Sequence, residues 1–231
     1  FDTQEKPDSK EKKDVLKVVG NHAPPVRIFE EDMATGFYYD ILREIGRRKN
    51  IKFIFEKTAF NMCFKQLKLG KADLMAGANK TKDRLNQFTF SKATLPAATK
   101  SFFGSIDSDP IMRYEDLANR ILILMSDANY NKRICEDESI KKIYVPNYDT
   151  IVKMVAKNSK YVAIIPTMQG EYLSYTLGID LMRSPFTIKG VPSHLIFSKY
   201  LDSSFVTLID EGLSEVMASD IYQKILIMYE K

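Results

Sequence analysis

The sequence has 231 residues, of which 45 % are hydrophobic and 28 % are charged, and its formal net charge is +4. This length suits one large domain or two medium lobes with separate cores, and the composition is typical of an ordinary globular protein. The mild charge, without a basic cluster interleaved with aromatic residues, argues against a nucleic-acid partner. No apolar run approaches the roughly 20 residues that a membrane-spanning helix requires.

Residues 1–13 are almost entirely polar, so they bury too little apolar surface to become ordered, and we expect a flexible leader. This composition fits what remains after a signal peptide has been removed, although a chain shortened by other means would look the same. The leader is therefore compatible with export, in which case a signal peptide has been removed.

Residues 15–76 alternate between predicted strands and helices. In chain order we expect a strand at 15–19, a hairpin arm at 28–29, a helix with Asp40 as N-cap, a strand at 52–56, a helix at 60–70 and a strand at 74–76. The spacing of the apolar residues indicates which segments are strands and which are helices, and glycines mark the ends of the first strand and the second helix. The resulting β-α-β-α-β order predicts a doubly wound parallel sheet.

An extended crossing strand at 97–104 leads to a second unit of the same kind. We expect a short helix at 114–117, a strand at 121–125, a helix at 131–135, a strand at 143–145, a helix capped by Asp149, a strand at 161–165, a helix at 169–175, a return strand at 188–197 and terminal helices at 205–217 and 221–228. The apolar runs ILILM and YVAII predict buried parallel strands. Two such units separated by a crossing segment predict a two-lobed architecture.

The stretch from Gly70 to Ser91 (GKADLMAGANKTKDRLNQFTFS) places a polar turn directly after a short apolar strand. In open α/β sheets, ligands bind just beyond the carboxyl ends of the strands. The turn at 77–79 offers backbone and amide groups, Thr81 can cap a short helix, and Arg84 offers a forked cation suited to a carboxylate. Taken alone, Arg84 is better explained as a solvated surface charge.

Several separated motifs resemble one family. The pattern G-K-x-D-L…T-x-x-R-x-x-x-F-x-F-S, the segment GFYYDILREI at 36–45 and the closing segment SDIYQKILIMYEK at 219–231 resemble the family 3 extracellular solute-binding proteins, the polar amino-acid binders of ABC importers. The likeness covers nearly everything from Val15 to the C-terminus, which leaves out only the leader.

The resemblance implies an α/β, two-lobed periplasmic-binding-protein type II fold, in which two doubly wound α/β lobes are joined by two hinge strands. Lobe I would comprise residues 14–100 and 197–231, and lobe II would comprise residues 101–196. The hinges would lie near 98–105 and 191–197.

In lobe I the resemblance implies that Arg84 holds a ligand carboxylate by a bidentate bond. Asn79 and the backbone of Gly77 and Ala78 would hold neighbouring polar atoms of the ligand. Phe60 falls where family members place an aromatic ring that stacks on the ligand, and an ordinary core phenylalanine is nearly as good an explanation.

In lobe II the resemblance implies a small polar turn formed by Ser126, Asp127 and Asn129, at the start of a helix that also receives the ligand carboxylate. Asp127 is unusual there, because a carboxylate repels an anion. It either caps the following helix or takes the ammonium group of the ligand.

Two positions depart from the family pattern. Amino-acid binders of this family carry an acidic residue that pairs with the ligand's ammonium group, and that place falls on Pro166, next to Thr167. After the first strand the chain has His22 and lacks the usual acidic and aromatic residues. His22 is either a hydrogen-bonded loop residue or a donor to the ligand and a sensor of pH. Carboxylate recognition is therefore expected to be retained, whereas ammonium recognition is altered.

Cys63 and Cys135 fall in different predicted lobes, where a disulfide would restrain any hinge, so we expect two separate and mostly buried thiols. Two cysteines and two histidines far apart in the sequence make no metal-site spacing, and we expect no metal or other cofactor.

The function that the resemblance implies is non-catalytic. Two lobes would close over a small carboxylate-bearing solute, an amino acid or a related acid, and the closed monomer would deliver it to the membrane subunits of an ABC importer. One alternative is a ligand-sensing domain of a membrane receptor with a kinase or cyclase. Another is an enzyme similar to cyclohexadienyl dehydratases, which would need His22 or Asp127 as an acid/base group beside the carboxylate clamp.

Overall fold

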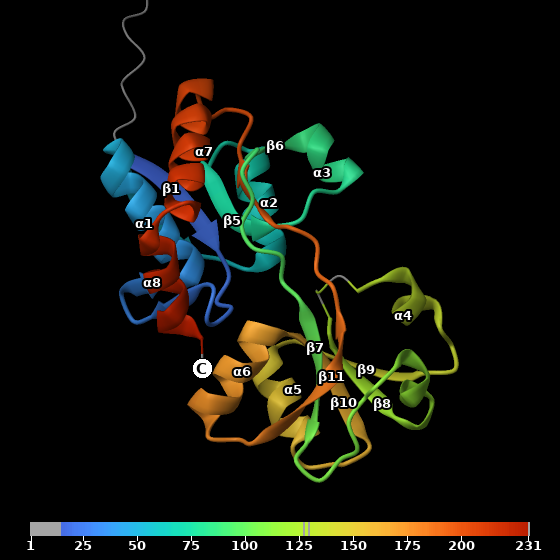
Figure 1. The fold of residues 1–231 in the computed structure, drawn as a ribbon. Coiled ribbons are helices and arrows are strands. Elements are labelled where there is room, and N and C mark those ends of the chain that lie inside the picture. The colour runs from blue at the N-terminus through green and yellow to red at the C-terminus, as the bar shows by residue number, and fades with distance from the viewer. Residues whose placement is uncertain (1–14, 127, 129, 231) are drawn as a thin grey trace, which may run out of the picture.

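A computed structural model describes residues 15–126, 128 and 130–230 of the chain. Two lobes are visible, each built on a five-stranded mixed sheet with helices packed against it (Figure 1). Two segments of the chain cross from one lobe to the other. The predicted two-lobed α/β architecture is confirmed.

The sheet of lobe I has the strand order β4-β1-β5-β12-β6. Its strands are β1 (Val15–Gly20), β4 (Lys52–Lys57), β5 (Leu74–Ala78), β6 (Thr89–Phe90) and β12 (His194–Phe197). Strand β1 runs parallel to β4 and β5, whereas β12 is antiparallel to β5 and β6. A separate hairpin joins β2 (Ile28–Glu30) and β3 (Met33–Thr35).

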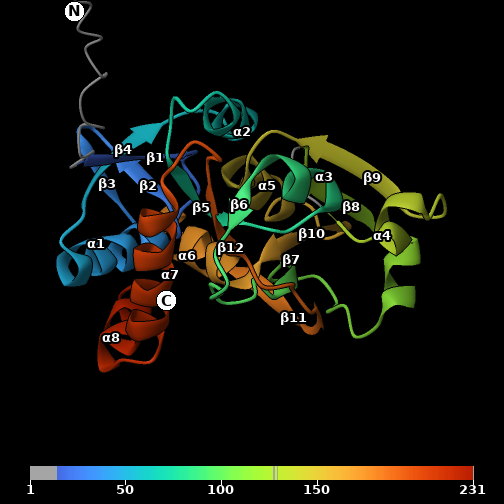
Figure 2. The same ribbon diagram turned by 90° about the horizontal axis from the view of Figure 1, so that it is seen from above.

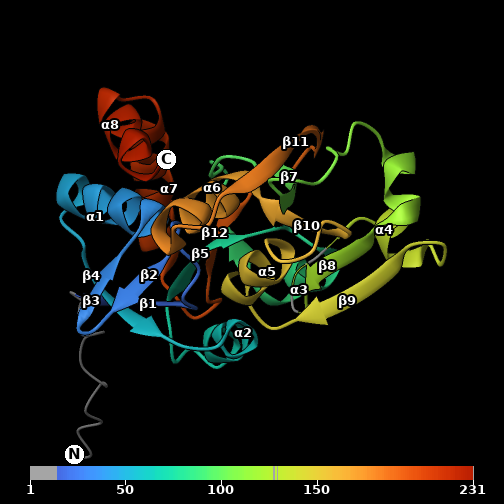
Figure 3. The same cartoon turned by 90° about the horizontal axis from the view of Figure 1, so that it is seen from below.

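Helices cover both faces of this sheet, as Figures 2 and 3 show from opposite sides. The helices of lobe I are α1 (Phe37–Lys49), α2 (Phe60–Lys68), α3 (Lys82–Gln87), α7 (Ser203–Met217) and α8 (Asp220–Tyr229). Side chains at 74–76 of β5 alternate between the two faces: Leu74 and Ala76 pack with α1 and α7, whereas Met75 packs with α2. This alternation is the period of an extended strand, and it explains why both faces need a covering helix.

The sheet of lobe II has the strand order β11-β7-β10-β8-β9. Its strands are β7 (Lys100–Ser105), β8 (Ile121–Met125), β9 (Lys141–Val145), β10 (Tyr161–Pro166) and β11 (Leu181–Ile188). Its helices are the 3-10 helix η1 (Tyr114–Asn119), α4 (Lys132–Glu136), α5 (Tyr148–Val155) and α6 (Thr167–Leu177). Strands β8, β9 and β10 are parallel, and β7 and β11 are antiparallel to their neighbours.

Both sheets contain the same local arrangement. In lobe I the first strand β1 lies between β4 and β5, and in lobe II β8 lies between β9 and β10. The strands that follow the central strand therefore lie on its two opposite sides. In open α/β sheets, ligands bind beyond the carboxyl end of the strand where the strand order reverses in this way.

The crossing segments are residues 91–99, between β6 and β7, and residues 189–193, between β11 and β12. They lie side by side, because the amide of Leu95 donates to the carbonyl of Ser193 at 2.9 Å. A Cβ atom on Gly190 would lie 2.0 Å from the carbonyl oxygen of Ala98, so this close approach requires glycine. The hinge positions remain a prediction, and these pairings favour 91–99 and 189–193.

The structure differs from the predicted return strand at 188–197. Strand β11 (Leu181–Ile188) was not predicted, and it contains Pro185, a residue that is unfavourable in a strand interior. The pairing of β11 with β7 shifts its register between Arg183 and Thr187, and this irregularity accommodates the proline. The return to lobe I is then the separate strand β12.

Two predicted helix caps are wrong. Helix α1 begins at Phe37 after Gly36, whose φ of 118° favours glycine, and Asp40 lies inside its first turn. The hydroxyl of Tyr229 in α8 donates to the Asp40 carboxylate, which ties α8 to α1. Asn147, and not Asp149, caps α5 by accepting from the amide of Thr150 at 2.9 Å.

The two cysteines are free thiols: Cys63 is buried, and burial raises its pKa to about 11, whereas Cys135 is exposed. The expectation of a mostly buried Cys135 is therefore wrong, because its short helix α4 leaves that side uncovered. No helix in the described part of the chain is both long and apolar enough to cross a bilayer.

Candidate ligand-binding cleft

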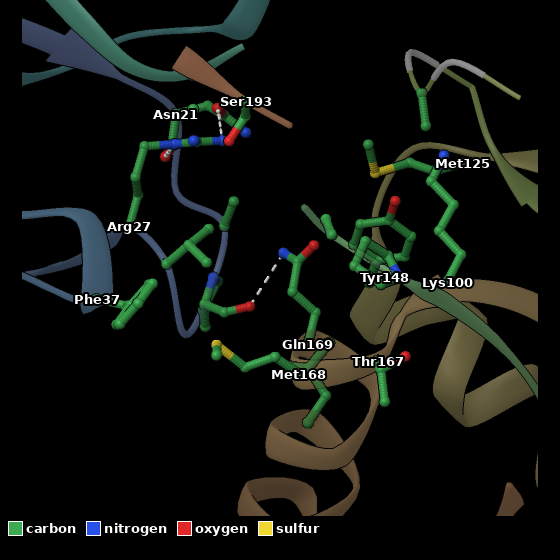
Figure 4. Close-up of a pocket in the computed structure, with 18 of the residues that line it drawn as sticks. Asn21, Arg27, Phe37, Lys100, Met125, Tyr148, Thr167, Met168, Gln169 and Ser193 are labelled. Carbon is green, nitrogen blue, oxygen red and sulfur yellow. Dashed lines mark hydrogen bonds between the residues drawn. The ribbon is translucent and has the colours of Figure 1, made fainter. Parts of the chain in front are cut away.

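A cavity of about 1110 Å³ lies between the two lobes. It is lined by residues that follow the parallel strands of both sheets: His22 after β1, Asn79 after β5, Tyr148 after β9 and Thr167 after β10. Figure 4 shows Arg27 from lobe I and Ser193 from the crossing segment on one side, and Lys100, Tyr148 and Thr167 from lobe II on the other. The cavity thus lies between the carboxyl ends of the parallel strands of the two sheets, where ligands bind in open α/β sheets.

Arg84 lies in the short helix α3 and lines the cavity. Thr81 caps this helix as predicted, accepting from the Arg84 amide at 3.3 Å. The guanidinium donates through Nη1 to the carbonyl of Asn79 at 3.1 Å, and its Cζ lies 4.3 Å from the ring centroid of Phe64. None of the carboxylates in the described chain pairs with it.

Burial lowers the pKa of Arg84 from its ordinary value. A guanidinium nevertheless stays protonated in proteins, so Arg84 remains a cation held by a carbonyl and a ring. These two neutral contacts orient the fork without neutralising its charge. The arrangement is suited to a ligand carboxylate.

The other lobe I residues of the predicted site also line the cavity. Gly77 and Ala78 belong to β5 and not to a turn, because β12 pairs with β5 as far as Ala78. Asn79 follows directly. Phe60 begins α2 and packs edge-to-face on Phe64, with ring centroids 5.2 Å apart.

His22 lines the cavity from the loop after β1. Its Nδ1 accepts a hydrogen bond from the amide of Phe29 at 3.0 Å, so the ring is held by the loop itself. Burial and the charge of Lys57 lower the pKa of His22, whereas Asp149 from lobe II and Glu30 raise it by a smaller amount. His22 is therefore a neutral side chain near pH 7.

Thr167 lines the cavity from the start of α6. Its hydroxyl donates to the carbonyl of Thr99 at 3.0 Å and lies 2.7 Å from the hydroxyl of Ser101. Ser126 is exposed and is not among the residues that line the cavity. Asp127 and Asn129 lie outside the described residues.

Sequence reasoning missed several cavity residues of lobe II, among them Lys100 and Tyr148. Lys100 begins β7, with its Nζ 4.6 Å from the ring centroid of Tyr130, and burial lowers its pKa. Burial also raises the pKa of Tyr148, which is hydrogen-bonded to Tyr130. Neither residue carries a sequence signal, because β7 and α5 are recognised only by their apolar residues.

The two lobes touch beside the cavity, where α6 meets lobe I (Figures 2 and 3). The side-chain amide of Gln169, which is 7 % exposed, donates to the carbonyl of Pro24 at 3.1 Å. Met168 and Tyr172 pack against the core of lobe I. These contacts are the described links between α6 and the opposite lobe, and they were not foreseen from the sequence.

The sequence model of the bacterial extracellular solute-binding proteins, family 3, matches residues 16–230. The chain belongs to this family. The predicted resemblance is therefore confirmed, and the fold is the type II periplasmic-binding-protein fold. Comparison with curated protein sequences gave no match.

Several solved structures share this fold at low sequence identity. The probable amino-acid ABC transporter extracellular-binding protein ytmK from Bacillus subtilis has a TM-score of 0.82 and 17 % identity, over 93 % of this chain and 97 % of that one. An ancestral arginine-binding protein bound to arginine has a TM-score of 0.79 and 20 % identity, over 94 % and 99 %. A histidine kinase sensor domain has a TM-score of 0.75 and 19 % identity, over 93 % and 95 %.

Proposed function

We propose that this family 3 protein binds a small carboxylate-bearing solute, an amino acid or a related acid, in the cleft between its lobes. The observation that carries the proposal is Arg84, a half-buried guanidinium in the cavity wall whose described partners are a carbonyl and an aromatic ring. A cation held only by neutral groups in a shielded site favours an anionic ligand. Asn79 and the β5 backbone lie close enough to hold neighbouring polar atoms.

Lobe closure follows from the position of the cavity between two sheets. A ligand that contacts Arg84 of lobe I together with Tyr148 and Thr167 of lobe II stabilises the closed conformation, in which the two lobes lie close together. The closed form would then be what a partner recognises.

The partner that we propose is the membrane part of an ABC importer, served by a monomer outside the cytoplasm. Family membership supports this, because the family is described as extracellular solute-binding proteins. Several proteins of similar structure are described as parts of amino-acid ABC transporters, including a substrate-binding domain from Streptococcus pneumoniae. Removal of a signal peptide is part of the same proposal.

A thermal-shift screen against amino acids, dicarboxylates, sugar acids and small amines tests the binding. A ligand that binds only the folded chain raises the melting temperature, by an amount that grows with its excess over the dissociation constant. A rise with acids and none with amines supports the proposal, and affinity is then measured by calorimetry. A rise with amines alone would contradict it.

A second candidate is a ligand-sensing domain of a membrane receptor. The observation in its favour is the histidine kinase sensor domain that shares the fold over 93 % of this chain. The gene sequence beyond Lys231 separates the two roles, since a receptor requires a membrane helix followed by a kinase or cyclase. An importer gene cluster without such a segment would favour transport.

We also propose that the site is non-catalytic. A dehydratase-like reaction needs an acid/base group beside the carboxylate clamp. The Nδ1 atom of His22 accepts from the Phe29 amide, so the neutral ring carries its proton on Nε2 and has no unoccupied acceptor nitrogen to act as a base. Consumption of a prephenate-like acid by the purified protein would contradict this proposal, and its persistence under the same conditions would support it.

A further inference from the structure

We propose that Arg27 forms a second anion subsite in the same cleft, so that the ligand is a small acid with two anionic groups. This inference rests on the proposed function, in which Arg84 holds the first carboxylate. Arg27 is 6 % exposed and still lines the cavity. It lies in the turn between β1 and β2, where the sequence showed only a single charged residue among apolar neighbours.

The hydrogen bonds that Arg27 donates within the described chain all go to neutral oxygen atoms. Its Nη1 donates to the carbonyl of Ala76 at 3.0 Å, its Nη2 to Asn21 Oδ1 at 2.9 Å and its Nε to the Asn21 carbonyl at 3.3 Å. No carboxylate in the described chain pairs with it. Since a guanidinium has five N–H donors and does not deprotonate, two donors and a full positive charge remain.

Burying such a charge is unfavourable unless an opposite charge accompanies it. The described protein supplies only carbonyl and amide dipoles to Arg27. An anionic group of the ligand would therefore complete this site, in the same way as a ligand carboxylate completes Arg84.

The Arg27 side chain is also held in place before any ligand arrives. It passes between two glycines: a Cβ atom would lie 2.9 Å from Arg27 Cδ if placed on Gly20, and 2.9 Å from Nη1 if placed on Gly77. Its Cζ lies 5.9 Å from the ring centroid of Tyr38, whose hydroxyl is 3.4 Å from that of Ser193. A fork fixed in this way loses little conformational entropy on binding.

The two guanidinium groups are close enough to act on one small ligand. Arg27 is anchored on the carbonyl of Ala76 and Arg84 on the carbonyl of Asn79, three residues further along the same segment. Three extended residues span at most about 10 Å. The two anchoring carbonyls are therefore no further apart than a small dicarboxylate that makes a hydrogen bond at each end.

The charge of the cavity wall agrees with a dianion. Five cationic side chains of the described chain line it, namely Arg27, Arg84, Lys100, Lys153 and Arg183. Three carboxylates line it, namely Asp149, Glu171 and Glu230, and Glu171 is paired with Arg183. Within the described chain, Arg27 and Arg84 donate hydrogen bonds to neutral oxygen atoms, and these two charges favour a ligand with two negative charges.

Calorimetry with matched acid and amide pairs tests this inference at about 0.1 M salt. The probes are succinate against succinamate and L-glutamate against L-glutamine, because each amide keeps the shape of its acid and removes one charge. We expect at least one acid to bind at least about tenfold more tightly than its amide, a ratio that corresponds to 1.4 kcal/mol. We expect Arg27→Gln to reduce that ratio below about threefold while binding of the amide is retained.

Arg48→Gln is the control, because Arg48 is a partly buried arginine of lobe I that pairs with Glu44 away from the cavity. It should leave the acid-to-amide ratio unchanged. If circular dichroism shows that Arg27→Gln does not fold, Arg27→Lys replaces it. This variant keeps the positive charge and should still prefer the acid. The acid-to-amide ratio of the wild-type protein then tests the inference.

Amides that bind the wild-type protein as tightly as their acids would overturn the inference, as would an unchanged ratio in folded Arg27→Gln. Binding of glutamine or other monocarboxylates without binding of any dianion would overturn it and leave the proposed function standing. Absence of binding by both classes would count against both.

Discussion

The lobe I wall of the cavity holds Arg27 and Arg84 on backbone carbonyls of one chain segment. The lobe II wall carries charges of both signs, with Glu171 paired to Arg183, among neutral groups. The Gln169 amide, the Thr167 hydroxyl and the Tyr148 ring come from α5 and α6, which pack on a separate core. The proposed recognition of ligand charge thus relies mainly on lobe I, whereas lobe II donates the hydrogen bond from Gln169 to lobe I. This hydrogen bond joins two neutral groups, so its net stabilisation is modest.

The largest effect is expected for a substitution that tests whether the stability of lobe II depends on its own hydrophobic core. Phe102 in β7 is fully buried and stacks on Phe186, with ring centroids 5.4 Å apart. Phe102→Ala should lower the free energy of unfolding by about 3–5 kcal/mol, because it leaves a cavity in a packed interior. Denaturant unfolding measures this loss.

Tyr144→Ala in β9 is the control for this prediction, because Tyr144 is 52 % exposed and should change stability by no more than about 0.5 kcal/mol. Equal losses for the two variants would mean that the core of lobe II does not determine its stability.

The charge of the lobe I wall is tested by Arg84→Ala. Binding of the acid that gives the largest melting shift should weaken by about 2–5 kcal/mol, because the carboxylate loses a charged partner in a shielded site. Calorimetry measures the change. Lys82→Ala in the same helix is the control, since Lys82 is exposed and outside the cavity wall. An unchanged affinity in Arg84→Ala would show that the carboxylate binds elsewhere.

The lobe contact is tested by Gln169→Ala. Loss of the hydrogen bond to the Pro24 carbonyl should reduce the stability of the closed arrangement by about 0.5–1.5 kcal/mol. Small-angle scattering should then show a larger radius of gyration for the ligand-free protein, and ligand affinity should fall by no more than about tenfold. Gln66→Ala in α2 removes an amide within lobe I and should change neither quantity.

The smallest effect concerns lobe I away from the cavity. Hydrogen bonds from Arg47 and Arg48 hold the pKa of Glu44 at about 2. Since Glu44 ionises more readily in the folded than in the unfolded chain, its contribution is present above the ordinary pKa of about 4.3 and is lost as the pH falls towards 2. Glu44→Gln should therefore cost about 0.5–1 kcal/mol at pH 7 and progressively less below pH 4.

Denaturant unfolding at several pH values measures that difference, and ligand affinity at pH 7 should stay unchanged in Glu44→Gln. Glu211→Gln is the control, because its nearest described cation, Lys49, is 3.9 Å away and its side chain is 59 % exposed. A difference between wild type and Glu44→Gln that is constant with pH would contradict the prediction.

Much of the fold could be predicted from the sequence because its signals are local. The apolar runs of β1, β8 and β10, the helix-capping Thr81 and the motif around Arg84 each lie within a short stretch of residues. Strand and helix periodicity, capping and the order of elements need no information about distant parts of the chain. Family membership and the two-lobed architecture follow from these same local patterns.

Contacts between distant segments could not be predicted in this way. Strand β11 contains a proline and exists because β7 pairs with it, and β5 extends to Ala78 because β12 returns beside it. Arg27 turns inward because Gly20 and Gly77 leave room for it between two strands. Gln169 reaches Pro24 only because the lobes fold towards each other. Pairing, burial and lobe contact depend on which segments meet in space, and that information is distributed over the whole chain.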